Sequence, residues 1–301
     1  MKVSILVPAY NEAGNIREVL ESLIGQKTHD AEIIEVLVIA SGCTDATVQI
    51  AREVARGKPG VRVHADEQRR GKVAAINQYI AMRDQRAEVL VIASADISVA
   101  PDVVEAIVQT FRERPEIGMA GARAVPDNEP NGVVNRMVLA LWDLHHRVAL
   151  EVPKMGELVA ARAELVERVS ELSVVDEASI EDVIRSKGFG LAYLPLAIVR
   201  NHGPERWEEY FEQRRRIACG HYWLEFAFGY QVATLHPFLI LKKTGELFFE
   251  QDAPGKLALA AAVGTEVAAR LAGFIDARIV GGRRRTWIPL PSTKKLKKSA
   301  A

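Results

Sequence analysis

One aspartate follows directly on a short apolar stretch in the first half of the chain. The stretch ends at Ala93-Ser94-Ala95-Asp96, and Pro101 indicates that the next helix starts about five residues later. Packing does not explain a carboxylate at the end of a buried strand, and this one is poorly placed to cap a helix. A hard divalent cation that bridges to phosphate oxygens does explain it. Asp96 is therefore a candidate metal ligand.

A second feature is a cluster of cations around Gly71, where a helix is expected to begin. Arg69, Arg70 and Lys72 flank this glycine. Positive charge at a helix N-terminus opposes the helix dipole, so the arrangement costs stability unless an anion lies nearby. A diphosphate would supply that anion, and a solvated charge cluster is the alternative.

Two further segments follow apolar runs. Pro8-Ala9-Tyr10-Asn11-Glu12 leaves backbone groups exposed against which a flat base could lie, although Asn11 could instead cap the next helix. In Ala40-Ser41-Gly42-Cys43-Thr44-Asp45, Gly42 permits a tight turn and Asp45 is expected to cap the following helix. A helix N-terminus at this place could also face an anion.

The second half of the chain offers a pair of carboxylates and a histidine. Glu181 and Asp182 follow Ser179, and the Ser179-x-x-Asp182 spacing is that of a capping box. Successive helical residues point about 100° apart, so at most one of the pair can face a cleft. His202 ends a predicted strand, and a lone histidine is usually an ordinary core or surface residue unless a metal is indicated independently.

The elements that position these residues alternate between strand and helix. Apolar runs predict strands at 3–7, 35–40, 61–64 and 88–93, and helical patterns fill 15–24, 46–55 and 73–82. This alternation indicates an α/β fold with a mostly parallel, Rossmann-like sheet flanked by helices. Ligands of such sheets bind at the carboxyl ends of the strands, where the first three segments above must meet.

The second half is less regular. We predict helices at 131–150 and 180–187, a strand at 191–199 broken at Pro195, and a helix at 207–219. From about residue 231 the chain becomes helical and alanine-rich and ends in a basic tail. The expected organisation is a domain over 1–230, with halves 1–95 and 96–230, and a helical C-terminal extension over 231–301.

Composition limits the class of protein. The 301 residues are 49% hydrophobic and 26% charged, and 39 basic residues balance 39 acidic ones, so no global field favours nucleic acid. Two cysteines without metal-ligand spacing fit a reducing, cytoplasmic compartment. Four charges within 257–280 argue against a membrane-spanning helix. The basic clusters at 283–285 and 294–298 indicate a solvated tail, or contact with donor phosphates or with anionic lipid at the inner face of the membrane.

Taken together, the segments resemble the family 2 glycosyltransferases, a group of inverting GT-A enzymes that includes cellulose and chitin synthases. The resemblance runs from residue 3 to about residue 220. It is carried by the opening turn at 7–12, by Lys72, Ala75 and Asn77, by Ser94-Ala95-Asp96 in place of Asp-x-Asp, by Gly156-Glu157 in the acceptor loop, by Glu181-Asp182 at the catalytic base, by His202, and by Gln213-Arg214-Arg215-Arg216-Ile217 in place of Gln-x-x-Arg-Trp.

The resemblance implies a metal-dependent hexosyltransferase that uses a UDP- or GDP-sugar. It implies Mg²⁺ or Mn²⁺ at Asp96 and His202, a diphosphate beside Lys72, and acceptor contacts at Gly156 and Glu157. Asp182, paired with Glu181, would be the general base, so that Asp182→Asn should slow turnover about 10²–10⁴-fold. Arg215 and Arg216 are candidate phosphate contacts. The donor-binding set comprises Pro8, Ala9, Tyr10, Glu12, Ser41, Lys72, Ser94, Ala95, Asp96, Gln213 and Arg216.

Three departures from the family pattern narrow this expectation. Ser94 replaces the first aspartate of Asp-x-Asp, and Ala40-Ser41 replaces carboxylates that often contact the base or ribose, which leaves the nucleotide open. Ile217 replaces the tryptophan, and no membrane channel follows, so a processive, secreting synthase is not expected.

The acceptor is a saccharide, a small molecule or a lipid-linked molecule, and a homo-oligomer is compatible with the chain. The aromatic-rich stretch 207–230 fits a core, a sugar-stacking platform or a surface beside a lipid-linked acceptor.

Two other classes share parts of this pattern. A sugar-nucleotide nucleotidyltransferase also uses a parallel sheet and a metal, but it usually carries a Gly-rich basic loop after the first strand, where this chain has Pro-Ala-Tyr-Asn-Glu. A non-catalytic nucleotide-sugar-binding module would explain the loss of carboxylates at Ala40 and Ser94. The presence of Asp96, Asp182 and His202 favours an enzyme.

Overall fold

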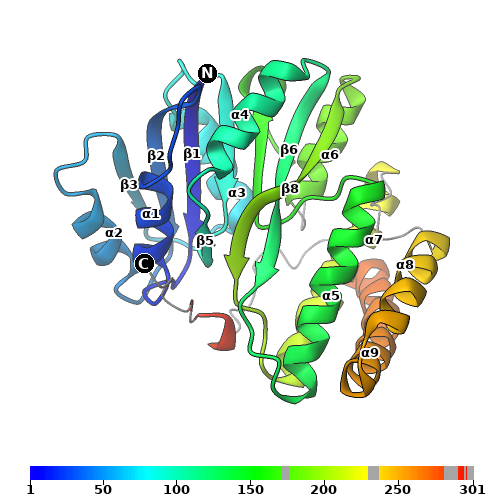
Figure 1. The fold of residues 1–301 in the computed structure, drawn as a ribbon. Helices are drawn as coiled ribbons and strands as arrows, with labels where there is room; N and C mark the ends of the chain where they lie inside the picture. The colour runs from blue at the N-terminus through cyan, green and yellow to red at the C-terminus, as the bar shows by residue number, and fades with distance from the viewer. Residues whose placement is uncertain (171–175, 230–236, 281–290, 295, 297–301) are drawn as a thin grey trace.

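The computed structural model describes residues 1–170, 176–229, 237–280, 291–294 and 296 (Figure 1). In chain order its main elements are β1 (Lys2–Ala9), α1 (Ile16–Ile24), β2 (Glu32–Ser41), α2 (Thr47–Ala55), β3 (Val61–Asp66), α3 (Lys72–Met82), β4 (Val89–Ala93), β5 (Ile97–Val99), α4 (Val103–Glu113), β6 (Ile117–Pro126), α5 (Gly132–Glu151), β7 (Leu158–Arg162), α6 (Asp176–Ser186), β8 (Gly190–Asn201), α7 (Trp207–Phe228), α8 (Pro237–Glu250) and α9 (Ala253–Val280).

The described strands form one eight-stranded sheet in the order β3-β2-β1-β4-β7-β6-β8-β5. The first four strands are parallel, as predicted, and β6 is parallel to β8. β7 runs antiparallel to β4 and β6, and β5 runs antiparallel to β8. The sheet is therefore mixed in its second half, where the sequence shows no regular strand–helix alternation.

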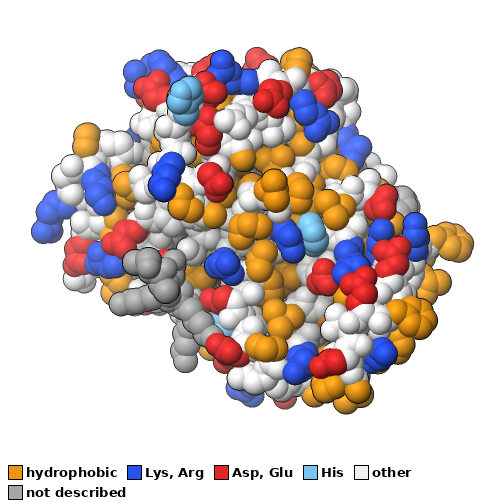
Figure 2. Space-filling model, viewed as in Figure 1, with side chains coloured by type: hydrophobic (Ala, Val, Ile, Leu, Met, Phe, Trp, Pro, Cys, Tyr) orange, Lys and Arg blue, Asp and Glu red, His pale blue; other side chains and the backbone are white. Residues whose placement is uncertain are grey.

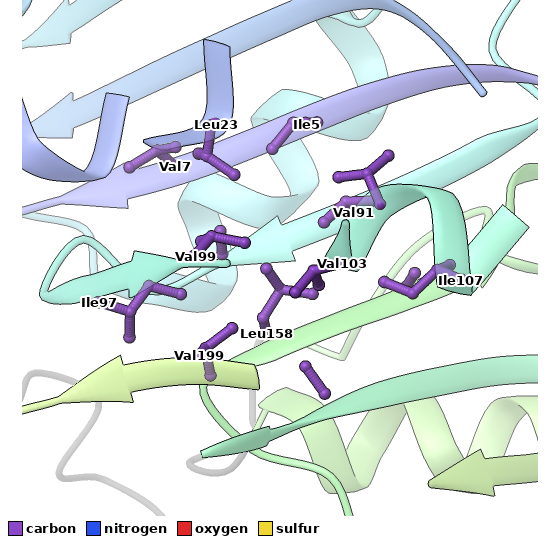
Figure 3. Packing of buried hydrophobic residues seen from close by; sticks show 14 of the residues in the cluster. Ile5, Val7, Leu23, Val91, Ile97, Val99, Val103, Ile107, Leu158 and Val199 are labelled. Atoms are coloured by element: carbon purple, nitrogen blue, oxygen red, sulfur yellow. The ribbon is translucent and has the colours of Figure 1, made fainter. Parts of the chain in front are cut away.

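Both faces of the sheet are covered by helices, because the central strands are apolar at nearly every position and successive side chains point to opposite faces. In β1, Val3, Ile5 and Val7 pack beneath α1 and α4, and Figure 3 shows Leu23 of α1 among them. The opposite face, which includes Leu6, packs against α3 and α6. This three-layer arrangement holds the carboxyl ends of β1, β2 and β4 at one edge.

The boundaries differ from the sequence prediction in three places. β8 is not broken at Pro195 but continues to Asn201, and residues 195–197 fall in a register shift against β6, where a proline without an N–H can be accommodated. α7 continues beyond Cys219 to Phe228. The described part of α6 begins at Asp176 instead of Ile180, and this shift changes the interpretation of the site below.

By length and composition alone, α9 could cross a membrane, and 33% of its most apolar stretch is buried. The sequence analysis argued against a spanning helix from four charges within 257–280, and that argument stays a prediction. In the structure two of these charges pair with α7: Glu266 lies 2.7 Å from Nε of Arg214, and Asp276 lies 2.8 Å from Nε of Arg215. These ion pairs attach α9 to α7, beside which it lies in Figure 1. The basic residues 283–285, 295 and 297–298 lie outside the described residues.

Candidate active site

A cavity of about 430 Å³ opens where the parallel strands β1, β2 and β4 end. This is the edge at which ligands bind in open α/β sheets. The cavity wall contains the whole predicted donor-binding set, together with Gly156, Glu157 and Glu181. A smaller cavity of about 50 Å³ adjoins it, and Asp96, Glu157 and His202 line this second space.

Strand pairing explains why Asp96 and His202 meet. Ile97 of β5 pairs antiparallel with Asn201 of β8, so the residues just outside this pair, Asp96 and His202, lie at the same end of the ladder. His202 is held in place by Asp127, whose Oδ1 is 2.5 Å from Nδ1. This hydrogen bond raises the pKa of His202 despite its burial. Asp96 and His202 thus both line the smaller cavity, and their joint role as metal ligands stays a prediction.

Glu157 lies beside Asp96, because β4 pairs with β7 and the backbone N–H of Ser94 donates to the carbonyl of Glu157 at 2.8 Å. Burial and the charge of Asp96 raise the pKa of Glu157 to about 7. Burial also raises the pKa of Asp96, against the nearby charges of Lys294 and Lys72. Glu157, expected in an acceptor loop, thus belongs to a carboxylate pair that is unfavourable without a cation.

The groups around this pair fit a divalent metal. Oδ1 of Asn201 is buried and has no hydrogen-bond partner among the described residues, while its Nδ2 donates to Glu157 at 3.2 Å. Two carboxylates and an orphaned amide oxygen are suitable donors for Mg²⁺ or Mn²⁺. His202 can join them only if its Nε2 leaves Oε1 of Glu205, which lies 3.3 Å away.

Another group of possible metal ligands, His29, Asp30 and Glu105, lies elsewhere in the fold. The Glu105 carboxylate accepts backbone N–H groups from residues 29, 30 and 31 at 2.8–3.1 Å. These hydrogen bonds account for the cluster without an ion.

An acidic pair that the sequence analysis missed lines the same cavity as the metal-ligand candidates. Nζ of Lys72 is 2.9 Å from Asp176 and 2.6 Å from Glu177, at the start of the described part of α6. Burial and the charge of Glu177 raise the pKa of Asp176 to about 7. Burial opposes ionisation of Glu177, but the ammonium of Lys72 outweighs it and holds the pKa of Glu177 below its usual value.

The sequence analysis predicted an anion beside the cations around Gly71. For Lys72, the anionic partners are the protein carboxylates of Asp176 and Glu177. The available signal was acidic residues in the first turn of a helix, which the helix dipole favours there. The sequence analysis began this helix at residue 180, so it did not place these acidic residues in the first turn of a helix.

Only Glu181 of the predicted catalytic pair lines the cavity. Its side chain is buried, and Oε1 accepts a hydrogen bond from the backbone N–H of Met155 at 3.4 Å. Asp182 is absent from the cavity wall, as the 100° rotation between successive residues requires. Ser179 lies within α6, so the capping-box interpretation of Ser179 and Asp182 is wrong.

Three loops around the nucleotide end of the cavity are tied together. Asn11 does not cap α1: its φ is 53°, and its Oδ1 accepts the N–H of Thr44 at 2.8 Å. The N-cap of α2 is Ala46, not Asp45, although Oδ1 of Asp45 accepts the N–H of Thr47, the first residue of α2, at 3.0 Å. The guanidinium of Arg69 lies 3.7 Å from the ring centre of Tyr10. The loop after β1 is therefore fixed by the loop after β2 and by the segment before α3.

The C-terminal part of the chain also reaches this site. Lys294 forms an ion pair with Glu12. Burial and the charge of Asp96 raise the pKa of Glu12 to about 8. The backbone N–H of Leu296 donates to Asn15 at 2.9 Å. A lysine from the basic tail therefore lines the donor side of the cavity.

The basic and aromatic residues of α7 lie in two environments, the cavity wall and the surface that contacts α9. Gln213, Arg214 and Arg216 line the cavity, whereas Arg215 is not in its wall and pairs with Asp276, so Arg215 is not placed to contact a donor phosphate. None of the described aromatic side chains between 207 and 228 lines the cavity. Several pack together or against α9, among them Trp207, whose Nε1 donates to Thr265 at 3.3 Å. A core role fits Tyr210, which is fully buried, but not Trp207, Phe226 and Phe228, which are 49%, 42% and 48% exposed. Tyr230 lies outside the described residues.

Comparison with known proteins agrees with this geometry. Residues 4–151 match the family model described as Glycosyl transferase family 2. Glycosyltransferase AglD of Haloferax volcanii is 30% identical over 134 residues, which are 42% of this chain and 20% of AglD. A poly-beta-1,6-N-acetyl-D-glucosamine synthase of Staphylococcus aureus is 24% identical over 233 residues, 72% of this chain and 54% of the synthase. The chain thus spans between a fifth and about half of these curated relatives.

Two solved structures resemble the chain over most of its length. The mannosyltransferase PcManGT of Pyrobaculum calidifontis, solved with GDP-Man and Mn²⁺, superposes with a TM-score of 0.63 at 21% identity, over 93% of this chain and 87% of that chain. Glucosyl-3-phosphoglycerate synthase of Mycobacterium tuberculosis, solved with Mn²⁺, UDP-Glc and phosphoglyceric acid, gives 0.51 at 22% identity, over 72% and 77%. The likeness confirms the expected GT-A fold.

Proposed function

Because this chain belongs to glycosyl transferase family 2 and has the GT-A fold, we propose that it transfers a hexose from a UDP- or GDP-sugar to an acceptor hydroxyl with inversion at the anomeric carbon. One observation carries the proposal. The carboxylates Asp96 and Glu157 and the acidic start of α6, Asp176 and Glu177, line a single cavity. Displacement at a sugar carbon needs such an arrangement, with a site for the leaving diphosphate and a separate base for the nucleophile.

The donor side is formed by the loops that end β1, β2 and β4. The nucleoside would lie against residues 8–12 and Ser41, where Arg69 and Tyr10 form a stacked platform. Arg216 and Lys294 line the same cavity and are suited to the diphosphate. Asp96, with Glu157, Asn201 and His202, would hold Mg²⁺ or Mn²⁺, which supplies positive charge to a departing diphosphate.

On the acceptor side, we assign the general base to Glu177 in place of Asp182. Glu177 lines the cavity, and Lys72 keeps it ionised at neutral pH. Its carboxylate takes the proton of the acceptor hydroxyl while that oxygen bonds to the anomeric carbon. The bond from this carbon to the diphosphate oxygen breaks, and the nucleoside diphosphate leaves with the bonding electron pair. One such displacement inverts the configuration.

The test is incubation of the full chain with a panel of UDP- and GDP-sugars, with Mn²⁺ or with EDTA, and measurement of the nucleotide released. We expect slow, metal-dependent hydrolysis of one donor to the nucleoside diphosphate, and faster release once an acceptor is supplied. NMR of the first-formed product identifies its anomeric configuration. Formation of a nucleotide sugar from a nucleoside triphosphate, with release of pyrophosphate, would instead identify a nucleotidyltransferase. Donor binding without turnover would identify a binding module.

We also propose peripheral contact with an anionic membrane surface through α8 and α9. Phe238 and Phe249 of α8 are 87% and 83% exposed, and Leu257 of α9 is 64% exposed. Figure 2 shows hydrophobic side chains along the lower right margin, over these helices. Co-sedimentation with vesicles that contain anionic lipid should exceed that with neutral vesicles, and Phe249→Glu should reduce it.

A further inference from the structure

A group of basic side chains gathers in the large cavity apart from the donor side. Lys154 precedes β7, Arg214 and His221 belong to α7, and Arg270 belongs to α9; all four line the cavity. We call these four residues the basic subsite. They come from separate parts of the sequence and meet because α7 and α9 lie side by side.

The basic subsite carries more positive than negative charge. Glu266 accepts hydrogen bonds from Nε of both Arg214, at 2.7 Å, and Arg270, at 3.0 Å, so one carboxylate serves two guanidinium groups. Lys154 makes no ion pair with the described residues. Burial, together with Arg214 and Arg270, lowers the pKa of Lys154 against the opposing charges of Glu181 and Glu177. Burial together with Lys154 and the two arginines lowers the pKa of His221 well below its usual value. His221 is therefore neutral, and three cations, Lys154, Arg214 and Arg270, face two carboxylates, Glu266 and Glu181.

His221 adds a separate observation. Its side chain lies on the cavity wall and the residue is only 3% exposed, yet Nε2 has no hydrogen-bond partner among the described residues. Buried polar atoms in folded proteins are normally paired. A ligand with acceptor or donor atoms in this part of the cavity would complete the pairing.

The cations of the subsite differ from those that act at the metal-ligand candidates. Arg216 and Lys294, which line the same cavity, are assigned to the donor diphosphate above. The donor therefore has its own cationic groups, and the basic subsite is left for another ligand. Its neighbours in the cavity wall include apolar side chains of α5 and α8: Leu141, Leu144, Val148 and Ile240.

We propose that the basic subsite binds the acceptor through an anionic group, a phosphate or a carboxylate, that is attached to an apolar body. The anionic group lies among Lys154, Arg214 and Arg270, and the apolar body lies along α5 and α8. This inference rests on the proposed function, because it assigns the ligand of the basic subsite as the acceptor of that transfer.

The test uses isothermal titration calorimetry of the full chain with three probes: n-hexyl phosphate, inorganic phosphate and n-hexyl β-glucoside. Each titration is run with and without saturating UDP or GDP and Mn²⁺, which fill the donor side. We expect n-hexyl phosphate to bind with the nucleotide present, and at least about tenfold more tightly than either other probe. Equal binding of the glucoside would refute the anionic group. Equal binding of inorganic phosphate would refute the apolar body and indicate a small free anion.

Variants locate the binding. Lys154→Met should weaken n-hexyl phosphate about tenfold or more, Lys154→Arg should restore most of the affinity, and Lys58→Met, an exposed lysine before β3, should have no effect. Thermal unfolding of each variant checks the fold. Unchanged affinity in a folded Lys154→Met variant would overturn the proposal. If no donor is hydrolysed while n-hexyl phosphate still binds through Lys154, the transfer assignment fails and the anion site stands.

Discussion

Gly42 offers a direct test of how the donor side of the cavity is built. This glycine lies at the end of β2 with a φ of +67°, and a Cβ placed on it would lie 2.6 Å from the backbone nitrogen of Arg69 and 2.9 Å from its Cα. Gly57, at the end of α2, provides the matched control: its φ is +74°, and nothing lies within 4 Å of a Cβ there. Alanine at both positions therefore meets the same backbone strain, but only Gly42→Ala meets a neighbouring chain.

The magnitudes follow from these two contributions. The left-handed conformation costs an alanine about 1–2 kcal/mol, and the loss of unfolded-state freedom returns about 0.4–1 kcal/mol. Gly57→Ala should therefore lower the free energy of unfolding by roughly 1 kcal/mol. The displaced backbone of residue 69 adds an overpacking cost of about 1–3 kcal/mol. Gly42→Ala should consequently cost roughly 2–4 kcal/mol in all.

Two assays separate strain from displacement. Urea unfolding of both variants measures the difference in stability. Steady-state kinetics with the donor that the panel identifies measures the second effect: Gly42→Ala should raise the donor KM, because Arg69 and Tyr10 line the cavity as one stacked pair. Gly57→Ala should leave this KM unchanged. Equal stability loss in both variants, or an unchanged donor KM in Gly42→Ala, would refute the reasoning that this loop is rigidly held.

Three further outcomes are expected. Asp96→Asn should reduce metal-dependent turnover by more than the about 10–100-fold loss that follows when a residue hydrogen-bonded to a metal ligand is changed. The thermal midpoint of this variant should not fall, because burial already disfavours the charge of Asp96, and a lower midpoint would contradict this. Glu177→Gln should slow turnover about 10²–10⁴-fold while Asp182→Asn, outside the cavity wall, should not; the reverse would restore Asp182 as the base. Burial and nearby cations lower the pKa of His145 from 6.5 to about 3 in the folded protein. As the pH falls from 7 to 5, the imidazole of His145 therefore takes up a proton only in the unfolded chain. Stability should then decrease by up to ~2 kcal/mol, and His145→Asn should show a smaller decrease in urea unfolding at the two pH values.

Much of the donor side could be predicted from local patterns. Apolar runs alternating with helical periodicity indicate parallel strands, and the carboxyl ends of such strands lie at one edge. That rule alone brings Pro8, Ser41 and Asp96 together, and all three line the cavity. The prediction succeeded because strand, turn and helix start are short-range properties.

The acidic side could not be predicted in the same way. The sequence analysis centred the base on Asp182 because it began the helix at Ile180, whereas the described part of α6 begins at Asp176. A helix turns about 100° with each residue, so which carboxylate faces a cavity depends on how the helix is seated against the sheet. Lys72 and Glu177 are 105 residues apart, and no local pattern relates them.

The sequence by itself therefore determined the layered α/β architecture and the set of residues at the strand ends, since these follow from hydrophobic periodicity and turn chemistry. Only the tertiary structure decided which charges face one another: Asp96 with Glu157, Lys72 with Asp176 and Glu177, and Arg214 with Arg270 across Glu266. The physical reason is that electrostatic interactions depend on distance and burial through space, and the chain brings these groups together only when its strands pair and its helices pack.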